Sequence, residues 1–217
     1  MYHQILKSGI VITSTQPEHV RQLERLQTIV FPTLAPELLF RAEHYLKHLE
    51  IFPEGQFVAL HGEQVVGATS TVRLPYDHGH HKHPSFAEII QGGWLTSHQP
   101  NGDWLYGADV SVHPHSRRMG IARGLYKARQ DLVHRLGLKG QIAGGMLSGY
   151  GAVKDKMSAI QYFEALLMDK IVDPTLSAQR RVGFELKELL PNYLDDPVCD
   201  NYGVLIMLPA GRQVALE

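Results

Sequence analysis

The segment from Val112 to Tyr126 (VHPHSRRMGIARGLY) has the residue types of a phosphate-binding turn. Arg117 and Arg118 precede Gly120, and a segment with helical periodicity follows. The first N–H groups of a helix have no partner within the helix, and the helix dipole adds partial positive charge there. Because glycine has no Cβ, a phosphate can approach those N–H groups closely. The spacing predicts a pyrophosphate site. The alternative is a plain helix entry with solvated arginines.

Two common nucleotide-binding motifs do not describe this turn. The Lys-Ser or Lys-Thr pair that ends a nucleoside-triphosphate P-loop is missing, and G-x-G-x-x-G does not occur. The predicted ligand therefore carries a pyrophosphate but is held in another way.

The elements on either side must hold this turn in place. Residues 103–112 (DWLYGADVSV) are a predicted strand, and residues 121–136 are a predicted helix that ends near Gly137. The apolar face of that helix consists of Ile121, Leu125, Ala128, Leu132 and Leu136.

The rest of the chain predicts one α+β domain over residues 1–217, built on a mixed sheet. Further strands are predicted at 10–14, 56–74 (a hairpin), 141–147, 183–190 and 201–208, and helices at 17–31, 35–52, 154–170 and 174–182. Two segments interrupt this order. Residues 76–102 are a long excursion with one helical turn around Phe86 to Ile90, and residues 152–172 contain an inserted helix.

Composition bounds the function. The net charge is −1, so there is no basic excess of the kind that nucleic-acid binders show. No apolar run approaches the roughly 20 residues needed to span a bilayer. Cys199 is the single cysteine and no secretory signal is seen, so we expect a cytoplasmic protein without a disulfide, a nucleic-acid partner or a membrane partner.

A histidine-rich tract is the other candidate for chemistry. His78, His80, His81 and His83 resemble metal ligands, but zinc sites need about four ligands at fixed angles. These histidines lie in a tract without periodicity and without a matching cluster elsewhere. We therefore expect a solvated loop and no metal.

The chain resembles the GCN5-related N-acetyltransferases (GNAT family). Residues 117–122 match the Arg/Gln-x-x-Gly-x-Gly/Ala signature of that family, and residues 112–114 match its Val-x-Pro lead-in. Gly183-Phe184 matches the Gly-Phe that commonly opens its sixth strand, and the order of predicted elements agrees over residues 10–208. The chain also resembles a longer-chain bacterial subgroup of this family. The resemblance implies a mostly antiparallel sheet of six to seven strands, flanked by helices and splayed between its fourth and fifth strands.

The resemblance also implies the cosubstrate, acetyl-CoA, and its binding residues. The pyrophosphate would lie on the backbone of Arg117, Arg118, Met119, Gly120, Ile121 and Ala122. The pantetheine arm would pair with the backbone of Val110, Ser111 and Val112. An amine would then attack the thioester directly in a ternary complex, with a nearby amide polarising the carbonyl.

The predicted reaction also needs a proton acceptor and a proton donor. An amine must lose a proton to attack, and Asp109 is the best candidate base; the alternative is a carboxylate that caps a neighbouring turn. The family often has a tyrosine four residues before the Gly-Phe pair, as the acid for the leaving thiolate, but Gln179 is found there. Tyr150 and Tyr162 are replacements by chemistry alone, with packing as their alternative role.

Two functions of different classes follow. The first is an acetyl-CoA-dependent N-acetyltransferase that acts on a small-molecule or protein amine, with a homodimer as one arrangement of the chain. The second is a non-catalytic acyl-CoA-binding module with a sensory or interaction role, which the missing tyrosine keeps open. The sequence does not identify the acceptor amine.

Overall fold

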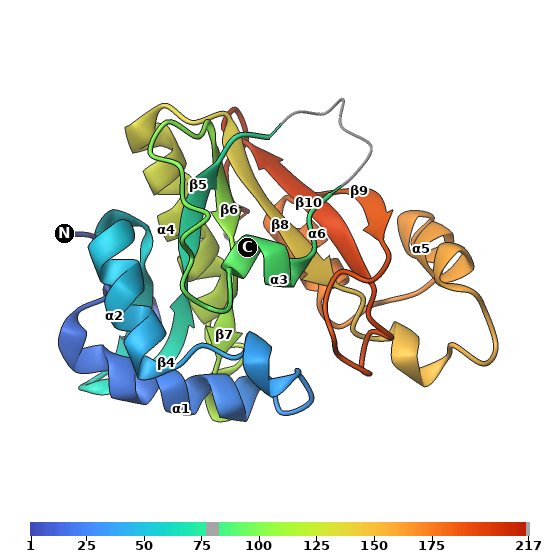
Figure 1. Cartoon of the computed structure of the whole chain (residues 1–217), viewed down its shortest axis with the longest axis horizontal. Coiled ribbons are helices and arrows are strands. Elements are labelled where there is room, and N and C mark those ends of the chain that lie inside the picture. Colours follow the sequence, from blue (N-terminus) through green and yellow to red (C-terminus); the bar gives the residue numbers. More distant parts are fainter. Residues whose placement is uncertain (77–82, 216–217) are drawn as a thin grey trace.

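The described residues form ten strands in two five-stranded sheets (Figure 1). The structure is a computed structural model that describes residues 1–76 and 83–215. The first sheet has the order β1-β2-β3-β4-β7, and the second has the order β5-β6-β8-β10-β9. The strands of the first sheet are β1 (His3–Ile5), β2 (Val11–Ser14), β3 (Phe57–His61), β4 (Gln64–Thr69) and β7 (Ser111–Val112). Those of the second are β5 (Thr71–Leu74), β6 (Trp104–Gly107), β8 (Gly140–Met146), β9 (Glu185–Leu190) and β10 (Gly203–Pro209).

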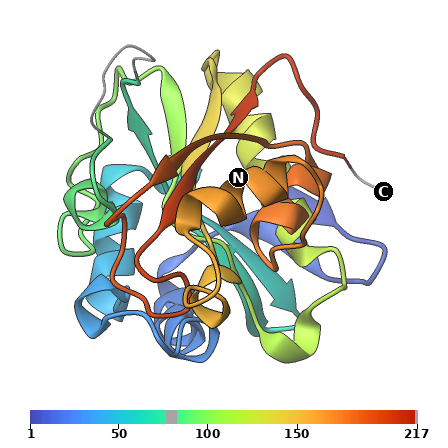
Figure 2. The same cartoon turned by 90° about the vertical axis from the view of Figure 1, so that its right-hand side faces the viewer.

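The helices are α1 (Val20–Val30), α2 (Ala42–Ile51), α3 (Phe86–Ile90), α4 (Ile121–Leu136), α5 (Ala159–Leu167) and α6 (Leu176–Val182). Figure 1 shows α1 and α2 at one end of the molecule and α5 at the other. In Figure 2 the orange helices α5 and α6 lie in front of the long strands of the second sheet, and α6 contacts β8 and β9. None of the helices in the described ranges is long and apolar enough to cross a bilayer.

Two adjacent strand breaks divide the sheet in two. β4 and β5 are interrupted at Ser70, and β6 and β7 are interrupted at residues 108–110. The breaks lie side by side, because Ala108 N donates to Ser70 O (2.9 Å) and Ser70 N donates to the Asp109 carboxylate (2.7 Å). The segments 64–74 and 103–112, each predicted as continuous, therefore contain two strands each.

The second sheet diverges from the first beyond these breaks. β6 pairs with β8 in parallel at Leu105–Gln141 and Tyr106–Ile142. The chain then crosses to the first sheet, where Ser111 pairs with Ala68, while β8 continues along β10 to Met146. The splayed sheet that the resemblance implied is confirmed, with more strands than the six to seven expected because β1 is added and two strands are broken.

Helix α4 is held by the apolar face that its periodicity predicted. Ile121, Leu125, Ala128 and Leu132 are buried, and Leu136 is partly buried. Burying each large side chain contributes about 1.5–3 kcal/mol, so this face fixes the helix firmly against the sheet. Gly137 ends α4 in the left-handed conformation (φ 64°), as expected of a C-terminal cap.

The described part of the excursion, residues 83–102, contributes to the core. Its helix, α3, spans Phe86–Ile90, the helical turn expected there. Ile90 and Leu95 have no exposed surface and pack in the main hydrophobic cluster. The inserted segment 152–172 contains α5, which contacts β9.

Candidate functional site

The turn at the start of α4, residues 117–122, has an open backbone conformation. Arg118 (φ 63°) and Gly120 (φ 82°) both lie in the left-handed region. A Cβ built on Gly120 would meet nothing within 4 Å, so the space above this glycine is open. Arg117 and Arg118 are exposed beside it. This α4 entry turn therefore offers unpartnered helix N–H groups and two guanidinium groups to an anion.

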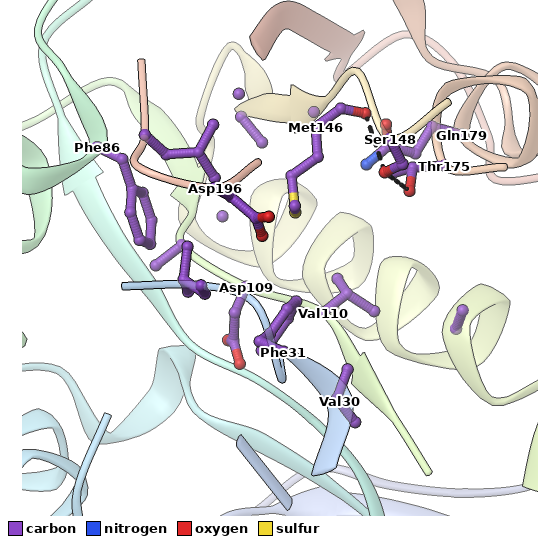
Figure 3. Close-up of a pocket in the computed structure, with 18 of the residues that line it drawn as sticks. Val30, Phe31, Phe86, Asp109, Val110, Met146, Ser148, Thr175, Gln179 and Asp196 are labelled. Atoms are coloured by element: carbon purple, nitrogen blue, oxygen red, sulfur yellow. Dashed lines mark hydrogen bonds between the residues drawn. The ribbon is translucent and has the colours of Figure 1, made fainter. Parts of the chain in front are cut away.

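A cavity of about 560 Å³ runs from the α4 entry turn into the gap between the two sheets (Figure 3). Arg117, Val112 and Ala122 line its α4 end. Residues 107–110 and 143–146 line its middle, where the sheets diverge. Residues 30–34 line the side nearest α1, and Phe86 and residues 193–194 line the far end.

The predicted cosubstrate residues divide into two groups around this cavity. Four of them line it: Val110, Val112, Arg117 and Ala122. The others are not among its lining residues. The side chain of Ser111 is fully buried, that of Ile121 packs in the core, and Arg118, Met119 and Gly120 form the entry turn beyond the cavity's edge.

Asp109 lies at the strand break and lines the cavity. Its carboxylate accepts hydrogen bonds from Ser70 N (2.7 Å), Gln27 Nε2 (2.8 Å) and Ser111 Oγ (3.0 Å). Burial raises the pKa of Asp109, while these donors and the nearby Arg129 guanidinium act in the opposite direction. The contacts suit both interpretations of this residue, a base close to working pH and a carboxylate that caps the break at Ser70.

Arg129 on α4 hydrogen-bonds to the backbone and a side chain at the strand break. It is 2% exposed, and its guanidinium donates to the Asp109 carbonyl and to the Thr69 hydroxyl. Gly107 is required beside it, because a Cβ there would collide with that guanidinium. Both broken strands are thus tied to one buried cation on α4.

The two tyrosines proposed from chemistry alone lie away from the cavity. Tyr150 and Tyr162 are both 5% exposed, their rings are 5.7 Å apart, and neither is among the cavity's lining residues. Tyr162 donates to the Asp173 carboxylate (3.2 Å). Burial raises the pKa of both hydroxyls. The structure does not bring either one together with Asp109.

A different tyrosine is found next to Gln179. Gln179 Nε2 donates to the hydroxyl oxygen of Tyr126 (3.1 Å), and Tyr126 lines the cavity from α4. Sequence reasoning missed this residue, although a signal existed. Ala122, Tyr126 and Arg129 follow the i, i+4, i+7 spacing of one helix face, and all three line the cavity.

Asp196 is the second residue that sequence reasoning missed. It lies in the connection between β9 and β10, is 1% exposed and lines the cavity. Its approach to Asp109 depends on the fold of segments far apart in the chain, so no local pattern indicates it.

Gly144 and Gly145, adjacent in β8, allow close packing, and His83 of the histidine-rich tract contacts a carboxylate. A Cβ on Gly144 would collide with the Tyr193 ring, and one on Gly145 would collide with Gln179, so this pair allows close packing. His83 pairs with the Glu188 carboxylate (2.9 Å), while His78, His80 and His81 lie outside the described residues. Within residues 1–76 and 83–215 no group of three His, Cys, Asp or Glu residues is arranged to hold a metal ion.

Comparison with known proteins supplies the family. The sequence profile of the Acetyltransferase (GNAT) family matches residues 20–143, more than half of the chain. The chain belongs to the GNAT family. It is 31% identical over 199 residues to the uncharacterized N-acetyltransferase YkwB of Bacillus subtilis, covering 91% of this chain and 88% of that one. It is 37% identical over 198 residues to the probable hydrolase YhcX of the same organism. That match includes 91% of this chain but only 38% of the relative's length.

Solved structures share the fold at lower identity. The loading GNATL domain of CurA from Lyngbya majuscula matches with a TM-score of 0.78 at 19% identity, over 97% of this chain and 98% of that one. The GphF GNAT-like decarboxylase in complex with isobutyryl-CoA matches with a TM-score of 0.71 at 19% identity, over 92% and 98%. The GNAT fold of this chain is therefore established by sequence and by structure.

Proposed function

We propose that this protein is an acetyl-CoA-dependent N-acetyltransferase that transfers the acetyl group to an amine by direct attack in a ternary complex. The observation that carries the proposal is the continuous cavity that joins the α4 entry turn to the carboxylate of Asp109 across the strand break. Membership of the GNAT family supports the same chemistry.

In this proposal the cosubstrate follows the long axis of the cavity. The pyrophosphate lies on the N–H groups of residues 117–122, next to the open side of Gly120. The pantetheine arm runs past Val112 and Val110, which line the cavity, toward the gap where β6 and β8 diverge. An amide at the break polarises the thioester carbonyl, as an oxyanion donor does.

The chemical step needs one proton removed and one supplied. The neutral amine nitrogen attacks the carbonyl carbon, the C–S bond breaks, and the acetyl group remains on nitrogen. Asp109 takes the proton from the amine, directly or through one water, and its pKa raised by burial suits that task. Tyr126 replaces Tyr150 and Tyr162 as the proposed donor to the CoA thiolate, because it lines the cavity and they do not.

The charge of the cavity favours an amine over an anionic acyl group. Asp109 and Asp196 both line it, whereas the Arg129 guanidinium is engaged with the strand break. Negative charge repels an acyl group that carries a carboxylate and attracts an ammonium ion.

Cys199 is not a candidate nucleophile for hydrolysis, because it is fully buried and burial raises the pKa of its thiol to about 12.

The decisive experiment measures free CoA from acetyl-CoA with and without a panel of amines, together with the mass of each product. The proposal expects CoA release that depends on the amine and an amine heavier by one acetyl group. Tight acetyl-CoA binding without turnover across the panel would instead support the non-catalytic acyl-CoA-binding module. The feature that favours this alternative is Gln179, which is found where the family often has a tyrosine. CoA release that does not depend on the amine would indicate a hydrolase.

A further inference from the structure

The far end of the cavity is lined mainly by apolar side chains, with one carboxylate and the Tyr193 hydroxyl, which contacts the Tyr106 hydroxyl. Leu38, Phe40 and Phe86 contribute side chains from the segment after α1 and from α3, and all three are buried. Among the described lining residues the cations are Arg117, at the α4 end, and Arg129, whose guanidinium is tied to the strand break. The far end, as far as the structure describes it, therefore offers apolar walls and negative charge, with no cation placed to receive an anion.

Asp196 supplies the negative charge in a fixed orientation. Its Oδ1 accepts a hydrogen bond from Val198 N (2.9 Å), and its backbone N–H donates to the Asn201 side chain (3.0 Å). Oδ2 takes no hydrogen bond from the described residues, and Figure 3 shows the carboxylate directed into the cavity. A carboxylate that is 1% exposed and has one unpartnered oxygen is a strong site for a cation, because desolvation makes an unpaired charge costly.

The loop that carries Asp196 is anchored to the apolar walls. Ala35 N donates to Asp195 O (3.1 Å), and Phe86 N donates to Tyr193 O (2.7 Å). These bonds join the connection between β9 and β10 to the segment after α1 and to α3. The carboxylate and the apolar walls are therefore joined through backbone hydrogen bonds in one pocket.

We propose that the acceptor is a primary amine on an apolar body, without an anionic group, and that Asp196 binds its ammonium ion before deprotonation. This inference rests on the proposed N-acetyltransferase function and adds the class of acceptor to it. The aromatic and aliphatic walls take the body of the amine, and Asp196 takes the charge. An amino acid is rejected, because its carboxylate would lie among apolar groups and beside Asp196 without a partner.

The first test compares phenethylamine, L-phenylalanine and spermidine as acceptors, with saturating acetyl-CoA. Phenethylamine and phenylalanine differ by one carboxylate, so we expect kcat/KM to be at least about 100-fold lower for phenylalanine, because its carboxylate would make a buried like-charge contact. Spermidine, which has cations but no aromatic body, should also be a poorer acceptor than phenethylamine. Equal use of phenylalanine, or a preference for spermidine, would overturn the acceptor class and leave the transferase function standing. No acetylation of any amine would overturn both.

The second test uses Asp196→Asn, with Asp195→Asn as its matched control. The amide introduced by Asp196→Asn keeps an oxygen that can accept from Val198 N, so the loop should fold, as circular dichroism and thermal unfolding would show. Loss of a charge-assisted contact should raise the KM for phenethylamine at least about 10-fold and leave the KM for acetyl-CoA unchanged. Asp195 is exposed and does not line the cavity, so its variant should behave as wild type. A folded Asp196→Asn protein with an unchanged amine KM would contradict the role of Asp196.

Discussion

Asp109 joins three parts of the chain at one carboxylate. Its donors come from α1 (Gln27), from the break between β4 and β5 (Ser70) and from β7 (Ser111). These hydrogen bonds orient the carboxylate, and they also help to hold the fold together. Experiments must therefore distinguish a catalytic role of Asp109 from a structural one.

We expect Asp109→Asn to lower kcat by about 100-fold or more, the lower range for loss of general-base help, with acetyl-CoA affinity little changed. Because the base works when ionised and burial raises the pKa of Asp109, kcat/KM of the wild type should rise with pH across a range above that of an ordinary aspartate. The Asp109→Asn variant should not show this rise of kcat/KM with pH. Steady-state kinetics between about pH 5 and 9 check both points, and a folded variant with full kcat at every pH would leave Asp109 with the structural role alone.

The same raised pKa has a consequence for stability. The folded protein binds this proton more tightly than the unfolded chain, so ionisation of Asp109 lowers the free energy of unfolding as pH rises from the ordinary aspartate value to the raised one. Denaturant unfolding of wild type and Asp109→Asn over that range separates this effect from the kinetic one.

Tyr126→Phe tests the proposed acid. The change removes the hydroxyl that Gln179 contacts but keeps the ring, which packs against Phe184 with centroids 5.0 Å apart. We expect kcat to fall about 10²-fold, with the KM for acetyl-CoA unchanged. Tyr162→Phe is the control, since that hydroxyl contacts Asp173 away from the cavity. The assignment is wrong if Tyr162→Phe, and not Tyr126→Phe, lowers kcat.

At the scale of elements, the start of α4 combines a helix N-terminus with a backbone shape that glycine adopts readily. Gly120 is the residue before the first helical turn, and its open side faces away from protein atoms. Any side chain there would enter the space proposed for the pyrophosphate.

We predict that Gly120→Glu weakens acetyl-CoA binding at least about 100-fold, or nearly 3 kcal/mol, because both volume and negative charge replace the phosphate. Isothermal calorimetry measures this directly. Gly62→Glu is a matched control, because Gly62 also has a positive φ (62°) and open space around its Cβ position but lies in the turn between β3 and β4. Equal loss of binding in both variants would point to backbone strain, and unchanged affinity in a folded Gly120→Glu protein would remove the turn from the binding site.

Sequence patterns predicted the elements whose signals are local. The helical turn at 86–90, the buried face of α4 and its cap at Gly137 depend on residues within a few turns of one another. The strand breaks could not be predicted in this way, because the bond that fixes them joins Ser70 to Asp109, 39 positions away. Asp196 and the approach of Gln179 to Tyr126 have the same origin in long-range packing.

At the scale of the whole molecule, the described part of the long excursion, residues 83–102, helps to shape the cavity. Phe86 lines the cavity, while Ile90 on the same helix is fully buried in the core. Removal of residues 76–102 would take Ile90 and Leu95 out of the core, so a deletion would report on folding before it reported on binding.

A homodimer and a cytoplasmic location remain predictions.

Point changes on α3 separate the two roles. Phe86→Ala and Ile90→Ala should each destabilise the fold by several kcal/mol, about 3–5 for the phenylalanine and about 2–5 for the isoleucine. Only Phe86→Ala should raise the acceptor KM, and it should do so without raising the KM for acetyl-CoA, because Phe86 lies at the far end of the cavity. Amine and acetyl-CoA titrations below the unfolding temperature of both variants would show this. Equal changes in both KM values would assign α3 to stability alone.

The strand break at Asp109 and the turn at Gly120 belong to one short, well-anchored stretch of chain. Arg129 and Ser70 hold one end, and the buried Ile121 holds the other. This stretch would therefore set a fixed distance: if the pyrophosphate is bound at the turn, the thioester carbon lies at the same position beside the strand break. An acyl group longer than acetyl must then extend into the space of the acceptor, so acyl length and amine size would compete for one volume.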